Sequence, residues 1–199
     1  MAAPEQEMAS IKHSLRALCV FCGQAGGRNP CYLTAAASLG QQLALTGITL
    51  VYGGGHTGMM GTLAETALRN GGHVIGIIPD CLTSMDALSL ALTERVVVPS
   101  LEVRKRLMME RADAFCILPG GVGTMDEVFE VLTQKQLGLL PKPVLLVNVA
   151  GYFEAWHFLA DTIIGEEFAT DRIRRLYRMV DSVDQVLSTL AEELTIPAR

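Results

Sequence analysis

Short apolar runs alternate along the chain with longer stretches in which apolar residues recur at helical spacing. The runs lie at 17–22, 49–52, 73–78, 95–98, 114–118 and 144–149, with a shorter last one near 176–180. Runs of this length are typical of strands buried on both faces, and the stretches between them are long enough for helices. The alternation predicts an α/β fold: a Rossmann-like, doubly wound parallel sheet in three layers, forming a single domain.

Residues 118–127, Leu-Pro-Gly-Gly-Val-Gly-Thr-Met-Asp-Glu, link one of these strands to a helix. They follow the run AFCIL and precede a helical pattern that ends near Gly138. Glycines let a backbone approach a ligand closely, and the first N–H groups of a helix attract anions. The segment therefore predicts a phosphate-binding loop, with the carboxylate of Glu127 within reach of whatever the phosphate carries.

Thr124 and Glu127 also fit a structural motif, the capping box. In this motif a Thr side chain accepts a hydrogen bond from the third helical residue, and a Glu three positions on reaches back to the cap. The sequence Thr-Met-Asp-Glu has this spacing. On this segment alone, both interpretations stay open.

A second glycine-rich loop, Gly-Gly-Gly-His-Thr-Gly-Met-Met-Gly at 53–61, also follows a strand-like run and precedes a helix-like stretch. Gly53, Gly55 and Gly58 fit G-x-G-x-x-G, and Asp80 follows about 20 residues on, as in dinucleotide sites. No Lys-Ser or Lys-Thr pair follows, so the loop is not a P-loop. A dinucleotide-dependent oxidoreductase is one interpretation, but it leaves the loop at 118–127 unexplained.

The third candidate cluster is Arg104-Lys105-Arg106, near the start of a predicted helix that follows the strand 95–98. Cations in a first turn oppose the helix macrodipole, which favours an outside anion as their partner. We expect Arg104 to face that ligand. A solvated helix face is the alternative, above all for Arg106, because charged runs usually lie in solvent.

All three clusters follow the ends of predicted strands, and so does the segment 23–27, Gly-Gln-Ala-Gly-Gly. In doubly wound sheets ligands bind in the crevice outside the carboxyl ends of the strands. The four loops are therefore expected to converge on one crevice. This convergence favours a functional role for Glu127 over capping.

The composition narrows the function further. The chain has 199 residues, of which 50% are apolar and 19% charged, and a formal net charge of −5. Its length suits one domain, expected at 17–195 after a disordered tail at 1–16. The acidic balance predicts no nucleic-acid partner, and the tail has no apolar stretch typical of a signal peptide or membrane anchor, so no membrane partner is expected.

The cysteines and histidines predict neither disulfides nor a metal. Five cysteines, an odd number, suit a reducing cytoplasm. Cys19 and Cys22 have C-x-x-C spacing, but positions i and i+3 of a strand face opposite ways, whereas redox pairs lie at helix starts. The four histidines have no cysteine or acidic partners at ligand spacing, so no metal cofactor is expected.

The segment PGGVGTMDE fits the pattern P-G-G-x-G-T-x-x-E. Together with GGGHTGMMG and the pair Arg104-Lys105, it resembles the Lonely Guy (LOG) family from about Leu18 to Leu190. The resemblance implies a phosphoribohydrolase without a cofactor. Such an enzyme cleaves cytokinin riboside 5′-monophosphates, and in many members AMP, to the free base and ribose 5-phosphate.

Residue by residue, the resemblance assigns catalytic roles to Arg104 and Glu127. The substrate-binding positions that it implies are Gly23, Gly54, Gly55, Asp86, Arg104, Lys105, Gly120, Gly121, Gly123, Thr124, Asp126 and Thr133. Three places depart from the family pattern. Asp86 stands for a glutamate, Gln24-Ala25 for two serines and Leu101-Glu102 for a Met-His pair.

Apolar helix segments favour self-association. Met59-Met60, Met108-Met109 and the stretch 128–140 exceed what one small sheet needs covered, although the same residues would also suit a core. The family resemblance implies a homodimer or higher homo-oligomer. In that assembly, helices beside the catalytic loops pack across a twofold axis.

The residue types suit N-glycosidic hydrolysis. Breaking a ribosyl C–N bond passes through an oxocarbenium-like centre, and a carboxylate such as Glu127 stabilises that charge or activates the attacking water. Arg104 is always cationic, so it suits a clamp on phosphate or sugar, or a donor to the departing base. A decarboxylase is not favoured, because none of the four lysines has the context of a pyridoxal Schiff base.

A non-catalytic nucleotide or molybdenum-cofactor binding protein of the same fold is the alternative to a hydrolase. Such a protein would keep both glycine loops but would have no use for a paired Arg and Glu. The residues of a base pocket carry no motif, so isopentenyladenine nucleotides and AMP remain equal candidates as substrates.

Overall fold

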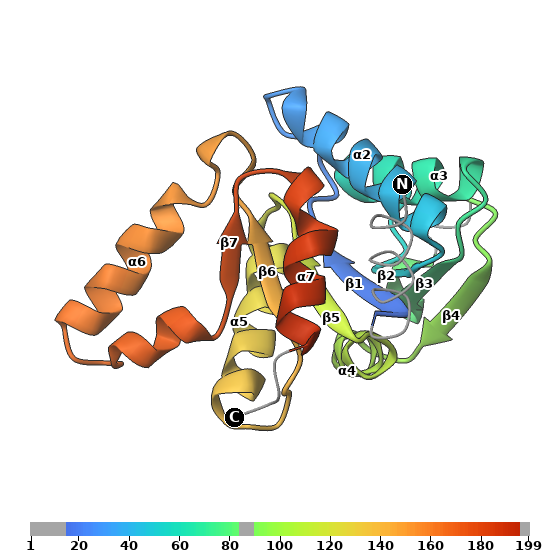
Figure 1. Cartoon of the computed structure of the whole chain (residues 1–199). Coiled ribbons are helices and arrows are strands. Elements are labelled where there is room, and N and C mark those ends of the chain that lie inside the picture. The colour runs from blue at the N-terminus through green and yellow to red at the C-terminus, as the bar shows by residue number, and fades with distance from the viewer. Residues whose placement is uncertain (1–14, 84–89, 196–199) are drawn as a thin grey trace.

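The computed structural model describes residues 15–83 and 90–195, which form one parallel sheet covered by helices (Figure 1). The strands are β1 (Ala17–Phe21), β2 (Thr49–Tyr52), β3 (Val74–Pro79), β4 (Glu94–Val98), β5 (Ala114–Ile117), β6 (Val144–Val147) and β7 (Arg178–Val180). The main helices are α2 (Cys31–Thr46), α3 (Gly58–Arg69), α4 (Leu101–Arg111), α5 (Val122–Gln136), α6 (Glu154–Gly165) and α7 (Val186–Thr195). Every predicted strand is confirmed.

The order of the strands places the glycine loops. Across the sheet the order is β4-β3-β2-β1-β5-β6-β7, and every neighbouring pair is parallel. The chain builds outward in one direction from β1 to β4 and then returns to the other side of β1 with β5. The order therefore reverses between β1 and β5, and the doubly wound fold is confirmed. Such a switch point opens a crevice at the carboxyl ends of its strands.

Two hydrophobic cores cover the two faces of the sheet. One joins the sheet to α2, α3 and α7, and the other joins it to α4, α5 and α6, which gives the expected three layers. The central strands are buried along their whole length, as both faces require. Cys19 and Cys22 pack into different cores and both are free thiols, so the C-x-x-C pair is structural as predicted.

The folded domain begins earlier than predicted. Leu15 is fully buried, and the N–H of Arg16 donates a hydrogen bond of 2.8 Å to Asp113, so both residues belong to the domain rather than to a tail. Residues 1–14 lie outside the described part of the chain. Within that part, none of the helices combines the length and apolar character that crossing a membrane would require.

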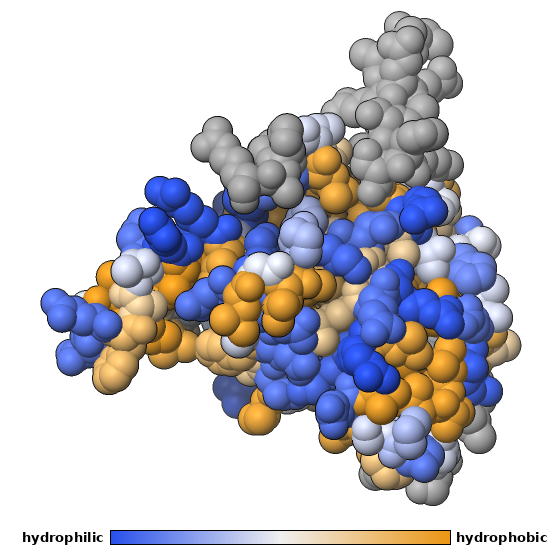
Figure 2. Space-filling model, turned by 90° about the horizontal axis from the view of Figure 1, so that it is seen from below, coloured by the Kyte–Doolittle hydropathy of each residue, from blue (hydrophilic) through white to orange (hydrophobic). Residues whose placement is uncertain are grey.

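Helix α6 and the short helix η3 (Asp171–Arg175) form an arm that projects from the body of the sheet (Figure 1). Phe158 and Phe168, which belong to this arm, are 75% and 86% exposed. Figure 2 shows the arm standing out from the body, with apolar residues among hydrophilic ones. In contrast, Met59, Met108 and Met109 are buried. These methionines fill the cores, which was the alternative interpretation, so they do not themselves support self-association.

Candidate active site

Helix α5 begins inside the glycine loop. Its first residue is Val122 and its N-cap is Gly121, so no side chain of the N-cap residue caps the helix. Thr124 is therefore the third helical residue and Glu127 the sixth, so the capping box is wrong. A glycine N-cap has no side chain with which to satisfy the first N–H groups of the helix. These groups are left for a ligand.

The loops after β1, β2 and β5 are bonded to one another. The N–H of Gly23 donates to the carbonyl of Pro119 at 3.0 Å, and the N–H of Met60 donates to the carbonyl of Gly23 at 3.2 Å. The hydroxyl of Thr57 donates to the carbonyl of Gln24 at 3.1 Å. The loop at 23–27 is thus held between the two glycine loops, as convergence at the switch point predicts.

The three loops enclose a cavity of about 500 Å³. The predicted site residues that line it are Gly23, Gly54, Gly55, Arg104, Gly120, Gly121, Gly123, Thr124 and Glu127. Most of them are glycines, so backbone atoms rather than side chains form this part of the wall. Gly120 shows why a side chain would not be tolerated, since a Cβ there would overlap the hydroxyl of Thr124.

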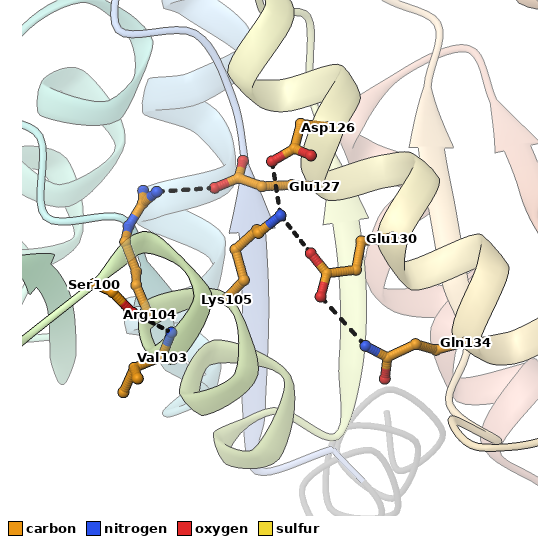
Figure 3. A network of polar contacts seen from close by, with 8 residues as sticks. All are labelled: Ser100, Val103, Arg104, Lys105, Asp126, Glu127, Glu130 and Gln134. Carbon is orange, nitrogen blue, oxygen red and sulfur yellow. Dashed lines mark hydrogen bonds and ion pairs between the residues drawn. The ribbon is translucent and has the colours of Figure 1, made fainter.

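Arg104 from α4 and Glu127 from α5 point toward each other at the cavity wall (Figure 3). Arg104 Nη1 lies 3.3 Å from Glu127 Oε1, and both side chains are largely buried. Arg104 Nε also donates to the carbonyl of Ile77 at 3.1 Å. A Cβ on Gly53 would overlap the guanidinium, so the glycine is what lets Arg104 lie against the loop.

The basic residues at the start of α4 have different partners and different exposure. Arg104 has Glu127 as an internal partner, in place of the outside anion expected from the helix dipole. Arg106 and Glu110 are both exposed and pair at 3.8 Å, so the solvated-face interpretation is confirmed for Arg106. The helix itself is capped by Ser100, whose hydroxyl accepts a hydrogen bond from the N–H of Val103.

The burial of Glu127 changes its acidity. Removal from water raises the pKa of the carboxyl from 4.5 to about 7. Arg104 opposes this shift by stabilising the carboxylate, whereas the negative charge of Asp126 adds to it. Near neutral pH the group therefore changes protonation state readily, which is what a general acid or base needs.

Lys105 and Asp126 do not line the cavity, although both were expected to contact substrate. Lys105 Nζ lies 2.8 Å from Asp126 Oδ2 and 2.5 Å from Glu130 Oε2 (Figure 3). These contacts join α4 to α5 beside the Arg104–Glu127 pair. Lys105 lies away from the cavity because it is one residue past Arg104, about 100° further round the helix.

One more expected contact also falls elsewhere. Thr133 is exposed on α5 and lines a smaller cavity of about 240 Å³ between α5 and the arm, because six residues turn it about 240° from Glu127. Asp86 lies outside the described residues. Asp80, proposed as the acid of a dinucleotide site, is exposed and does not line the larger cavity.

The sequence motifs assign no role to several of the side chains that line the cavity. The apolar side chains of Met60, Ile78 and Leu82 line the cavity on the side of the β2 loop, and His56 lines it as well. Tyr152, which lies near the glycine loop after β5, also belongs to the lining. Only the fold brings these residues together. Across residues 15–83 and 90–195, no three His, Cys, Asp or Glu side chains are grouped as a metal site would require.

A doubly wound sheet with two glycine loops and a buried Arg–Glu pair at its switch point is typical of Rossmann-like proteins with a nucleotide site. The family described as "Possible lysine decarboxylase" matches residues 60–190. Cytokinin riboside 5′-monophosphate phosphoribohydrolase LOG2 of Arabidopsis thaliana is 38% identical over 93% of this chain and 87% of its own length. Its counterpart LOG of Oryza sativa subsp. japonica is 39% identical over 89% and 73%. The chain belongs to the LOG family.

Solved structures share the fold at lower identity. The molybdenum cofactor carrier protein of Chlamydomonas reinhardtii superimposes with a TM-score of 0.66 at 22% identity, covering 90% of this chain and 98% of that protein. A molybdenum cofactor binding protein of Rippkaea orientalis gives 0.65 at 24% identity, covering 90% and 96%. At these identities the likeness is one of fold alone.

Proposed function

We propose that the protein hydrolyses the N-glycosidic bond of purine riboside 5′-monophosphates, both those of the cytokinin type and AMP, to free base and ribose 5-phosphate. The observation that carries the proposal is the buried pair of Arg104 and Glu127, 3.3 Å apart, at the wall of a cavity lined by two glycine loops. A protein that only binds nucleotides needs the loops but not the pair. The enzymes to which the chain is 38–39% identical carry the same activity in their names.

The cavity supports one orientation of the substrate. The phosphate fits the N-terminus of α5, where Gly121 and Gly123 leave open space and the first N–H groups are uncapped. The base fits the apolar side formed with Ile78, which packs on Gly54, and Met60, which packs on Gly55. The ribose then lies between these two ends, beside Glu127.

The reaction follows from this orientation. The oxygen of a water molecule bonds to C1′ while the bond from C1′ to the base nitrogen breaks, and the electron pair of that bond leaves with the base. As a carboxylate, Glu127 stabilises the positive charge that develops at C1′ and accepts a proton from the water. The base nitrogen gains one proton in return, so the base leaves as a neutral molecule and the carboxylate is restored. Arg104 holds the carboxylate in place and lowers the cost of its ionisation.

Comparison of AMP with adenosine tests the proposal. Charge-assisted contacts to the phosphate orient the sugar, so kcat/KM should be far higher for AMP than for adenosine. Triphosphates should be poor substrates, because the loop lacks the P-loop lysine. Comparable values for AMP and adenosine would show that the glycine loops do not bind phosphate.

We also propose a homodimer or higher homo-oligomer, working in the cytoplasm, where its free cysteines stay reduced. Exposed Phe158 and Phe168 on the arm, with Phe129 on α5, support association through this side of the molecule. Light scattering should give at least twice the mass of 21.4 kDa. Phe158→Asp should lower that mass, whereas Leu45→Asp, at an exposed position of α2, should not. A monomeric wild type at assay concentration would contradict the assembly.

A further inference from the structure

Tyr152 makes a contact with the glycine loop that no sequence motif marks. Its hydroxyl donates a hydrogen bond to the carbonyl oxygen of Gly120. Gly120 directly precedes Gly121, the N-cap of α5. The tyrosine therefore reaches from the segment after β6 to the loop where the phosphate of the substrate is proposed to bind.

This contact fixes the direction of one peptide group. The described part of the chain has no cis peptide bond, so the Gly120–Gly121 bond is trans. In a trans peptide the carbonyl and the N–H point in opposite directions. Because Tyr152 holds the oxygen of Gly120, the N–H of Gly121 is directed away from the tyrosine hydroxyl. This N–H has no acceptor among the hydrogen bonds of the described residues, and Gly121 lines the cavity.

The peptide group needs such a restraint because it joins two glycines. Glycine adopts many backbone conformations at little cost, so a peptide plane between two of them rotates easily. A Cβ built on Gly121 meets no atom within 4 Å, and the bond that the carbonyl of Gly121 accepts from the N–H of Met125 holds the following peptide group rather than this one. The hydroxyl of Tyr152 thus restrains a group that would otherwise be free to turn its N–H away from the ligand.

Tyr152 is itself held firmly. The turn before it contains Ala150 in a left-handed conformation with φ of 51°. The buried side chain of Asn148 stabilises this turn, because its Oδ1 accepts a hydrogen bond of 2.7 Å from the N–H of Phe153. The ring of Tyr152 also packs edge-on against Phe153 and Tyr32, with centroids 5.0 and 6.0 Å apart. The hydroxyl therefore has a defined position.

We propose that Tyr152 is a positioning residue that fixes the Gly120–Gly121 peptide and so aims the N–H of Gly121 at the phosphate of the substrate. The identity of that ligand, a nucleoside 5′-monophosphate, rests on the proposed function. The phosphate is bound before and during bond cleavage alike. Loss of the restraint therefore weakens substrate and transition state equally, which raises KM and leaves kcat nearly unchanged.

Tyr152→Phe tests the inference, because it keeps the ring and removes the hydroxyl. Isothermal titration calorimetry should show about tenfold weaker binding of inorganic phosphate and of AMP, since a hydrogen bond to a charged group is affected. Adenosine, which has no phosphate, should bind as it does to the wild type. The KM for AMP should rise by the same factor as its dissociation constant.

Tyr52→Phe is the matched control. Tyr52 is a buried tyrosine that ends β2, and its hydroxyl has no partner among the described residues. This variant should bind phosphate like the wild type. Unchanged phosphate binding by Tyr152→Phe, equal losses for AMP and adenosine, or a wild type that binds no phosphate would each overturn the role of Tyr152. A wild type that binds AMP without cleaving it would refute the hydrolase, while the phosphate comparison would still decide the role of Tyr152.

Discussion

Glu127→Gln should stabilise the protein at alkaline pH while removing most of its turnover. The side chain is 7% exposed, and burial raises its pKa from 4.5 to about 7. Gln has nearly the shape and hydrogen-bonding capacity of a protonated Glu but carries no charge. The substitution therefore isolates the cost of keeping a carboxylate at this place in the fold.

The magnitude follows from the two pKa values. Between pH 4.5 and 7 the unfolded chain releases the proton of Glu127 while the folded chain keeps it, so the free energy of unfolding falls as pH rises. At 1.36 kcal/mol per unit, the shift from 4.5 to about 7 corresponds to a loss of about 3 kcal/mol. The loss is complete above pH 7 and absent below pH 4.5. Glu127→Gln avoids this loss.

Chemical denaturation at pH 4.5 and pH 8 measures the difference. Wild type and Glu127→Gln should have similar free energies of unfolding at pH 4.5, and the variant should exceed the wild type by about 3 kcal/mol at pH 8. Glu110→Gln is the control, because Glu110 is exposed on α4 and its pair with Arg106 is loose. It should change stability by less than about 0.5 kcal/mol at either pH.

A lower stability of Glu127→Gln at pH 8 would refute this reasoning. It would mean that the carboxylate stabilises the fold, as a cap or ion pair does, and that its burial has no functional explanation. Full turnover by the variant would refute the catalytic role separately. The expected combination, higher stability with lost activity, is typical of a group retained for function rather than for folding.

Three further predictions test the geometry around Glu127. For wild type, kcat/KM should rise with pH through about 7 as the carboxylate forms, and a flat profile from pH 5 to 9 would exclude Glu127 as the titrating group. Gly53→Ala should lower kcat/KM by about 100-fold, because the added Cβ displaces the guanidinium of Arg104. Gly165→Ala, whose Cβ meets open space, should leave kcat/KM unchanged. Wild-type activity of Gly53→Ala would place Arg104 outside the mechanism. Lys105→Ala should move the acidic limb of the profile of kcat/KM against pH to higher pH, because Lys105 lowers the pKa of Glu127. Lys105→Arg should restore the wild-type profile. A changed KM without a shift of this limb would instead indicate that Lys105 contacts the substrate.

The fold and the central pair were accessible from the sequence because both depend on strong local signals. Each of the seven parallel strands corresponds to a short apolar run in the sequence. Once the strands alternate with helices, the loops at their carboxyl ends must converge. This rule brings Arg104 and Glu127, 23 positions apart in the chain, to within 3.3 Å.

The sequence-based predictions fail where single residues or side chains determine the local structure. A glycine N-cap leaves no side-chain signature, so the sequence does not show that α5 starts at Val122, and Thr124 remains a possible cap until the structure is known. The helical turn of α5 places Thr133 on a different face from Glu127, and a sequence motif does not show on which face of a helix its residues lie. Tyr152 reaches Gly120 across 32 positions, and only the folded chain reveals that contact.

The products formed from AMP test the central claim most directly. Purified protein incubated with AMP should release adenine and ribose 5-phosphate in equal amounts, quantified together by chromatography and mass spectrometry, and Glu127→Gln should release little of either. An isopentenyladenosine monophosphate run in parallel ranks the two bases. Binding of both nucleotides by the wild type with neither product formed would contradict the account and leave a nucleotide-binding protein of the same fold.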